Sequence, residues 1–272
     1  MRLTFFQTSW GSSQGGLEAF VDRVRESGFD GAEVFLPDPD TGIHELVDAA
    51  GLELSAHVYS SGSDWREHVR TLQERYLRAI ACGPSVVTSQ TGHDGFGFAD
   101  NLRIYEAGEE LVRHHGVPIR YETHRGRPTF SLAGTLDLLR EIPSMTLTAD
   151  VSHWMVVHES DLRDRDEQLD VALARTRHLH ARVGHEEGPQ VPDPRDPAWQ
   201  SHLERHLELW QRVVDHHARA ALERVTITTE FGPPPYLPTT PYAGAPVADQ
   251  WEINVFVRDW LRDALATSGS AT

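Results

Sequence analysis

Strand-like and helix-like segments alternate along the whole sequence, and this alternation limits the fold more than any other feature. Apolar residues at every second position mark the strand-like segments, whereas a spacing of three and four residues marks the helix-like ones. The expected strands cover 2–10, 31–37, 53–60, 85–94, segments beginning at 117, 145 and 176, and 224–231. The expected helices cover 16–28, 43–51, 65–81, 101–115, 131–142, 167–175, 199–222 and 251–266.

Eight strand–helix units at a spacing of roughly 30 residues are typical of consecutive βα repeats. No shift in composition separates the two halves of the chain, so the repeats favour a single (β/α)8 TIM barrel, an α/β fold, over a doubly wound sheet with a linker. We expect the barrel to span residues 1–266 and residues 267–272 to form a disordered C-terminal tail.

Composition excludes several classes of function. The chain has 41 acidic and 25 basic residues, a formal net charge of −16, which argues against nucleic acid as a partner. Every basic residue is arginine, and without lysine neither Schiff-base chemistry nor a Walker-type phosphate loop is available. Cys82 is the only cysteine, which excludes an internal disulfide and a thiolate metal cluster.

Nothing in the sequence indicates a membrane partner. No apolar run approaches the roughly 20 residues that a membrane-spanning helix needs. The first residues enter a strand pattern without a basic segment or cleavage site that would indicate a secretory signal. We therefore expect a cytoplasmic protein.

Four successive strands of the second half each end in a side chain that can bind a metal: Glu122, Asp150, His180 and Glu230. The carboxyl ends of barrel strands share one rim, so these side chains are expected to converge. Each alone could be a salt-bridged interior residue, but their repetition in register favours a metal site. Carboxylates and one imidazole suit a divalent ion, Mn²⁺ or Mg²⁺ first, with Co²⁺ or Zn²⁺ as alternatives.

One layer below this rim, the same strand faces carry Arg120, Thr148, His178 and Thr228, which predict a polar barrel interior. A buried arginine is costly unless it is paired. We therefore expect a carboxylate partner for Arg120, and Glu33 is one candidate.

Two long loops follow the seventh and eighth strands, at 184–197 and 232–250, and loops of this length are candidates for a lid. Gly232 is followed by three prolines, which have no N–H groups to cradle a phosphate. This favours a substrate without phosphate.

The ordered set Glu122, Asp150-Val-Ser-His153, His180 and Glu230 resembles the xylose isomerase-like TIM barrels, in particular the sugar isomerases and epimerases that include ketose 3-epimerases. The resemblance implies that Glu122 and Glu230 are catalytic, each binding the metal with one oxygen and exchanging a substrate proton with the other. Asp150 and His180 would be plain ligands, and the ion would stabilise an enediolate.

The chain departs from the epimerase pattern at two positions. Where those epimerases have an arginine six residues after the seventh-strand histidine and a glutamate six after the fifth-strand glutamate, this chain has Glu186 and Pro128. Arg125 and Arg127 are among the side chains that could replace these contacts. The candidate substrate-binding residues are His153, Arg182, His185, His57, His124 and Trp10, and the histidines and Trp10 have a structural interpretation as well.

The leading hypothesis is a divalent-metal-dependent isomerase or epimerase acting on a small-molecule sugar or polyol. A dehydratase or lyase on the same barrel begins with the same proton abstraction and stays open as an alternative. A nuclease of the endonuclease IV type fits the charge poorly, and a non-catalytic barrel subunit would not need a metal. A homo-oligomer also stays open.

Overall fold

The computed structural model describes residues 1–12 and 14–267, and within them eight parallel strands close into a barrel. The strands pair in sequence order, and β8 returns to pair with β1 over six residue pairs. The strands are β1 Arg2–Thr8, β2 Gly31–Phe35, β3 Glu53–Tyr59, β4 Val86–Gln90, β5 Ile119–Glu122, β6 Thr146–Ala149, β7 Thr176–Ala181 and β8 Arg224–Thr229. The predicted (β/α)8 TIM barrel is confirmed.

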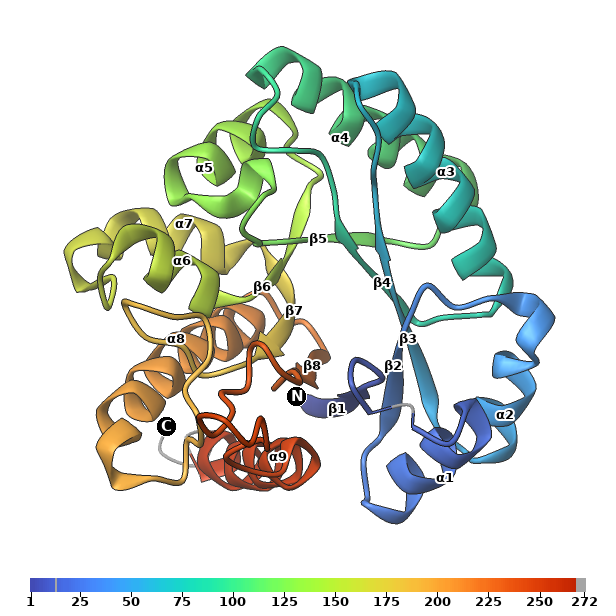
Figure 1. The fold of residues 1–272 in the computed structure, drawn as a ribbon. Helices are drawn as coiled ribbons and strands as arrows, with labels where there is room; N and C mark the ends of the chain where they lie inside the picture. Colours follow the sequence, from blue (N-terminus) through green and yellow to red (C-terminus); the bar gives the residue numbers. More distant parts are fainter. Residues whose placement is uncertain (13, 268–272) are drawn as a thin grey trace.

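Helices form the outer ring of the barrel (Figure 1). Within the described residues they are α1 Leu17–Glu26, α2 Ile43–Ala49, α3 Trp65–Ala81, α4 Phe98–His115, α5 Leu132–Glu141, α6 Val151–His158, α7 Asp166–Ala174, α8 Gln200–Arg219 and α9 Gln250–Thr267. The sequence pattern did not predict α6. Of the tail expected at 267–272, Thr267 is the last residue of α9, and residues 268–272 lie outside the described residues. In the described part of the chain, no helix has both the length and the apolar character needed to cross a bilayer.

The hydrophobic core lies between the strands and the helices. Strand residues such as Phe5, Val34 and Val87 are buried there beside the apolar faces of the helices, including Leu138 of α5 and Leu209 of α8. Burying a side chain of this size stabilises the fold by roughly 1.5–3 kcal/mol. The strands therefore keep their other faces for the barrel interior.

The barrel interior is polar, as the strand pattern predicts. The Thr88 hydroxyl donates to Thr148 Oγ1 across the barrel at 2.7 Å. The His178 ring lies between two threonines of β8, with Nδ1 2.8 Å from Thr226 Oγ1 and Nε2 3.0 Å from Thr228 Oγ1. Because these buried groups have hydrogen-bond partners, the polar interior does not incur the full cost of desolvation.

The expected carboxylate partner of Arg120 is not found among the described residues, and the suggestion of Glu33 is wrong. Arg120 Nη1 donates to the hydroxyl of Thr146, its register neighbour on β6, at 2.8 Å. Burial lowers the pKa of Arg120 to about 10. Glu33 lies on β2, three strands away in the barrel order, and its carboxylate contacts Thr228 and His180 instead.

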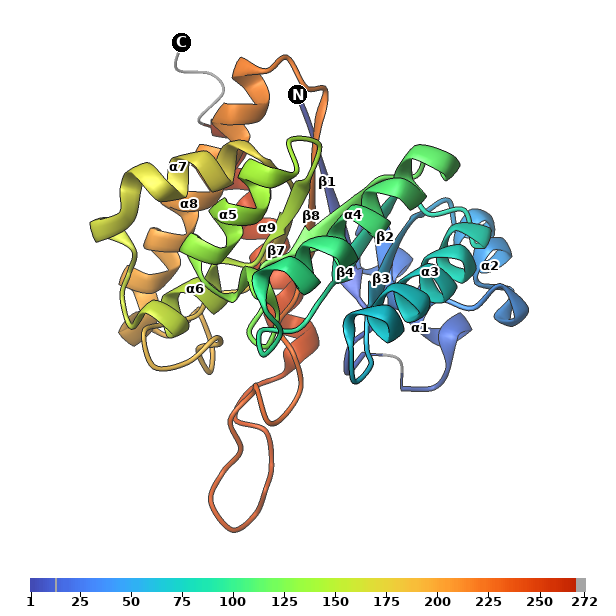
Figure 2. The same cartoon turned by 90° about the horizontal axis from the view of Figure 1, so that it is seen from above.

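The loop between β8 and α9 projects from the carboxyl end of the barrel (Figure 2). An antiparallel bridge between Thr239 and Pro246 makes its outer part a hairpin. The base of this loop is tied to the loop after β7, because Gly232 N donates to Gln190 Oε1 at 2.8 Å and Gln190 Nε2 donates to Gly232 O at 3.2 Å. The two predicted rim loops thus form one connected wall.

Candidate active site

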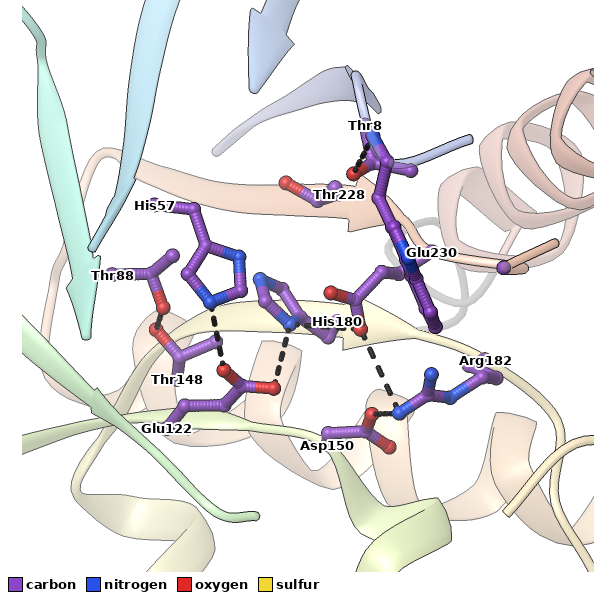
Figure 3. Close-up of polar contacts among 12 residues, drawn as sticks. Thr8, His57, Thr88, Glu122, Thr148, Asp150, His180, Arg182, Thr228 and Glu230 are labelled. Atoms are coloured by element: carbon purple, nitrogen blue, oxygen red, sulfur yellow. Dashed lines mark hydrogen bonds and ion pairs between the residues drawn. The ribbon is translucent and has the colours of Figure 1, made fainter. Parts of the chain in front are cut away.

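The carboxyl ends of β5, β7 and β8 bring Glu122, His180 and Glu230 together (Figure 3). His180 lies between the two carboxylates, with Nδ1 3.3 Å from Glu122 Oε1 and 3.0 Å from Glu230 Oε2. Asp150, directly after β6, completes a group whose ligand atoms all lie within 4.8 Å of one another. The structure therefore places the four predicted metal ligands in one cluster.

Burial and mutual attraction set the charge of this cluster. Burial alone would raise the pKa of Glu122, but His180 and His57 outweigh it and hold this pKa well below its usual value. Burial alone would lower the pKa of His180, but the carboxylates of Glu230, Glu33 and Glu122 raise it well above its usual value. The cluster thus keeps Glu122 ionised in a buried place beside a protonated His180, and a bound cation could replace that positive charge.

Asp150 differs from the other three members because both of its oxygens already have partners. It caps α6, and its Oδ1 accepts hydrogen bonds from Ser152 N at 3.0 Å and Ser152 Oγ at 2.5 Å. Its Oδ2 accepts from Arg182 Nη2. Burial raises the pKa of Asp150 to about 6, although the Arg182 guanidinium opposes that rise. A metal would have to share Asp150 with these groups.

Arg182 supplies a buried positive charge beside the cluster. Besides its pairing with Asp150, its Nη2 lies 2.9 Å from His153 Nε2 and 3.7 Å from Glu230 Oε2. The guanidinium also lies over the ring of Tyr236, 4.8 Å from the centroid. Attraction from Asp150 and Glu230 outweighs burial and raises the pKa of Arg182, so its charge is permanent.

A cavity of about 220 Å³ opens above the cluster. Among the predicted residues, its lining contains Glu122, Glu230, Trp10, His57, His124 and Arg182. This volume is below the roughly 300 Å³ at which pockets for drug-sized ligands begin, so the cavity suits a small ligand. Aromatic rings together with a few polar groups are the usual lining of such a site.

Two predicted substrate contacts do not line this cavity in the described part of the chain. His153 is fully buried behind His124, with ring centroids 4.1 Å apart, and its Nδ1 has no hydrogen-bond partner among the described residues. His185 lies in the loop after β7 and packs on Trp199 at a centroid distance of 4.9 Å. The structure thus places His153 next to the site and His185 outside it.

Three cavity residues were not predicted: Phe35, Gln90 and Tyr236. Phe35 and Gln90 are the last residues of β2 and β4. The strand-end argument that identifies Glu122 could have found them. Tyr236 lies in the proline-rich loop and contacts Trp10 edge-to-face at 4.9 Å. No periodic pattern marks a loop residue, so only the fold shows its position.

One family of known proteins matches most of the chain. The family model described as xylose isomerase-like TIM barrel matches residues 21–222. Among curated proteins, none matches the sequence.

Solved structures with the same fold have several activities. D-allulose 3-epimerase from Methylomonas sp., solved with D-allulose, has 15% identity and a TM-score of 0.68, with 97% of each chain covered. Endonuclease IV from Thermus thermophilus has 15% identity and a TM-score of 0.60, covering 98% of this chain and 100% of the other. A probable 3-DHS dehydratase from Bacillus anthracis has 13% identity and a TM-score of 0.57, covering 99% and 100%. At these identities the likeness shows the fold alone.

Proposed function

The chain belongs to the xylose isomerase-like TIM barrels, and from this premise we propose that it is a divalent-metal-dependent isomerase or epimerase of a sugar or polyol. One observation carries the proposal. The carboxylates of Glu122 and Glu230 lie on either side of His180 at the base of a small cavity (Figure 3). Two acid–base groups facing one small volume are what a reaction that removes and returns a proton requires.

The donor set fits a divalent ion. Oε2 of Glu122 and Oε2 of Glu230 are buried, and neither has a hydrogen-bond partner among the described residues. Both atoms lie near imidazole nitrogens, at 3.2 Å from His57 and 3.0 Å from His180, but without the angles of a hydrogen bond. Oxygen ligands with one imidazole suit Mn²⁺ or Mg²⁺, and Co²⁺ or Zn²⁺ can also take such ligands.

We assign Glu122, His180 and Glu230 as the residues that would hold the ion, with Asp150 as the fourth ligand. When bound, a divalent ion supplies Lewis acidity to substrate oxygens. The chain's own task is then proton transfer. The lowered pKa of Glu122 keeps this carboxylate ionised, so it can accept the substrate proton. Glu230, on the other side of His180, would enter the step with a proton of its own and donate it. A proton returned to the same carbon from the opposite face gives an epimer, and a proton returned to the neighbouring carbon gives an isomer.

The cavity wall fits a polyol. Trp10 and Tyr236 offer aromatic surface to C–H groups. Gln90 and His124 offer hydrogen-bonding groups to hydroxyls. Arg182 lines the same cavity, and no partner of its Nη1 within hydrogen-bond distance is seen in the described residues, so this group can contact a substrate oxygen.

Turnover in D₂O tests the proposal. With Mn²⁺ present, the wild-type chain should incorporate deuterium into a ketose and release a second sugar. Glu122→Gln and Glu230→Gln should each lower kcat by about 100-fold or more, because general acid–base groups contribute 10²–10⁴-fold. Glu74→Gln, an exposed glutamate on α3, is the matched control and should keep full activity.

Two results would contradict this assignment. Full activity in Glu230→Gln would show that this carboxylate does not exchange the proton. Loss of water from the substrate, in place of a sugar product, would show an elimination, and the chain would then be a dehydratase on the same barrel.

A further inference from the structure

We propose that Glu33 is the positioning residue that orients His180 toward the metal site. The inference rests on the proposed function, because it takes His180 as a metal ligand. Glu33 lies in the middle of β2, is fully buried and does not line the cavity. Its Oε1 is 3.1 Å from His180 Nε2, on the opposite edge of the ring from the nitrogen that faces Glu122 and Glu230.

The carboxylate of Glu33 is itself held in place from below. Its Oε2 accepts hydrogen bonds from the Ser55 hydroxyl at 2.8 Å and the Thr228 hydroxyl at 3.0 Å, and it lies 3.3 Å from His178 Nε2. These contacts come from β3, β8 and β7. With one oxygen fixed by three neighbouring side chains, the other oxygen has a defined position under His180.

This arrangement determines which nitrogen of His180 is free for a metal. A neutral imidazole carries its proton on one nitrogen and a lone pair on the other, and the hydrogen bond made by one nitrogen selects the role of the other. Glu33 Oε1 lies 3.1 Å from Nε2 without the angles of a hydrogen bond, but a carboxylate can only accept a proton, so the Nε2 that faces it keeps its N–H. Nδ1 faces Glu122 and Glu230 and presents its own N–H to them, and a bound ion would take the place of that proton. Carboxylate–histidine pairs of this kind orient metal ligands in proteins.

His57 links the same two glutamates on the cavity side. Its Nδ1 lies 3.7 Å from Glu33 Oε1, and its Nε2 lies 3.2 Å from Glu122 Oε2. Glu33, His57, Glu122 and His180 thus form a closed ring of alternating carboxylates and imidazoles. A change at Glu33 is therefore transmitted to a metal ligand through an imidazole and does not require contact with the ion.

Binding of Mn²⁺ alone, measured by isothermal titration calorimetry on the full chain, tests the assignment without activity. Glu33→Gln should weaken Mn²⁺ binding by about 10–100-fold, the usual effect of removing an outer partner of a metal ligand. Ser55→Ala and Thr228→Val are matched controls, since each removes one of the three contacts that fix Glu33 and leaves the other two, together with the contact with His180. Each control should change the affinity by less than about threefold.

A double-mutant cycle separates positioning from general loosening of the barrel. If Glu33 acts through His180, then Glu33→Gln should change Mn²⁺ affinity by less than about threefold when His180 is already replaced by Gln. Far-UV circular dichroism and Tm check that each variant folds. Should Glu33→Gln fail to fold, Glu33→Asp, which keeps the charge but is one methylene shorter, carries the same comparison.

The outcomes distinguish this inference from the proposed function. Wild-type Mn²⁺ affinity in a folded Glu33→Gln variant would overturn the role of Glu33. Losses of Mn²⁺ affinity in Ser55→Ala and Thr228→Val that are as large as the loss in Glu33→Gln would overturn it too. A wild-type chain that binds no Mn²⁺ would overturn it as well. Glu33-dependent Mn²⁺ binding without turnover of any sugar or polyol would overturn the proposed function and leave the role of Glu33 intact.

Discussion

Gly232 is a residue at which a single added carbon would directly disturb the cavity wall. A Cβ built on Gly232 would lie 2.2 Å from two atoms of the Trp10 ring, far inside contact distance. Trp10 in turn packs on Tyr236, and both line the cavity. Glycine is required here because the indole ring occupies the space where a side chain would begin.

We predict that Gly232→Ala displaces Trp10 and destabilises the protein by about 1–3 kcal/mol, the usual cost of overpacking. The KM for the substrate should rise more than kcat falls, since Trp10 would contact the substrate but not the proton. Urea unfolding and steady-state kinetics measure the two effects. Gly97→Ala is the control, because a Cβ there meets no atom within 4 Å. An unchanged KM in Gly232→Ala would show that Trp10 does not contact the substrate.

Asp150 shows how far a residue-level prediction reaches. Its position at a strand end could be predicted from the alternation around 145–150, and the structure places it within 4.8 Å of the other three candidates. Its pairing with Arg182 could not be predicted, because it depends on how a long side chain two residues beyond His180 folds back into the barrel. Sequence periodicity specifies the face of a strand, whereas partners depend on packing between strands.

At the scale of elements, the strands and most helices follow from periodicity, and α6 does not. Its sequence, Val151–His158, is apolar on nearly all sides, and Val151 to Met155 are all buried. A helix without a polar face lacks the spacing of three and four residues that reveals amphipathic helices. The sequence does indicate where α6 begins, because Asp150 is a residue type that caps helices. In the structure its side chain accepts a hydrogen bond from Ser152 N.

Helix α8 holds the loop after β7 through one buried histidine. His206 Nδ1 lies 2.8 Å from His202 O, and its Nε2 accepts a hydrogen bond from Gly184 N at 3.2 Å. Burial lowers the pKa of His206 to about 4. Because the unfolded chain binds a proton near pH 6.5, the stability that neutral His206 provides is lost as the pH falls from about 6.5 to about 4.

We predict that between pH 7 and pH 4 the wild type loses about 3 kcal/mol more unfolding free energy than His206→Gln, which cannot be protonated. Urea unfolding at both pH values measures this difference. The control is His44→Gln, an exposed histidine on α2, which should follow the wild type. Parallel losses in the wild type and His206→Gln would show that another group governs the acid sensitivity.

At the scale of the whole molecule, the eightfold repeat was sufficient to predict a closed barrel. Eight parallel strands, each followed by a helix that leads to the next strand, can be arranged in only a few ways. The fold determines the reaction less than the repeat determines the fold. The same fold, at 13–15% identity, carries an epimerase, an endonuclease and a probable dehydratase. This chain carries a net charge of −16, and Glu33, Glu122, Asp150 and Glu230 are all buried at or beneath its barrel mouth.

This concentration of buried negative charge leads to a prediction about metal and stability. An ion that binds only the folded barrel stabilises it by an amount that grows with its concentration, about 2.7 kcal/mol at 100 times Kd. For a domain of this size that corresponds to a rise in Tm of roughly 5–10 °C. Differential scanning calorimetry with Mn²⁺ should show this rise, and EDTA should reverse it.

The variant Glu122→Gln/Glu230→Gln decides where that ion binds. It removes two charges from the cluster and should abolish the rise in Tm, since the remaining donors cannot hold the ion. Surface groups offer a competing explanation, and the pair of His202 and Glu186, 3.1 Å apart on the outside of the barrel, is a specific example. His202→Gln should therefore keep the full rise. If the rise disappears in His202→Gln and persists in the double variant, the ion binds at the surface, and the barrel mouth has to neutralise its four carboxylates with Arg182 and the histidines alone.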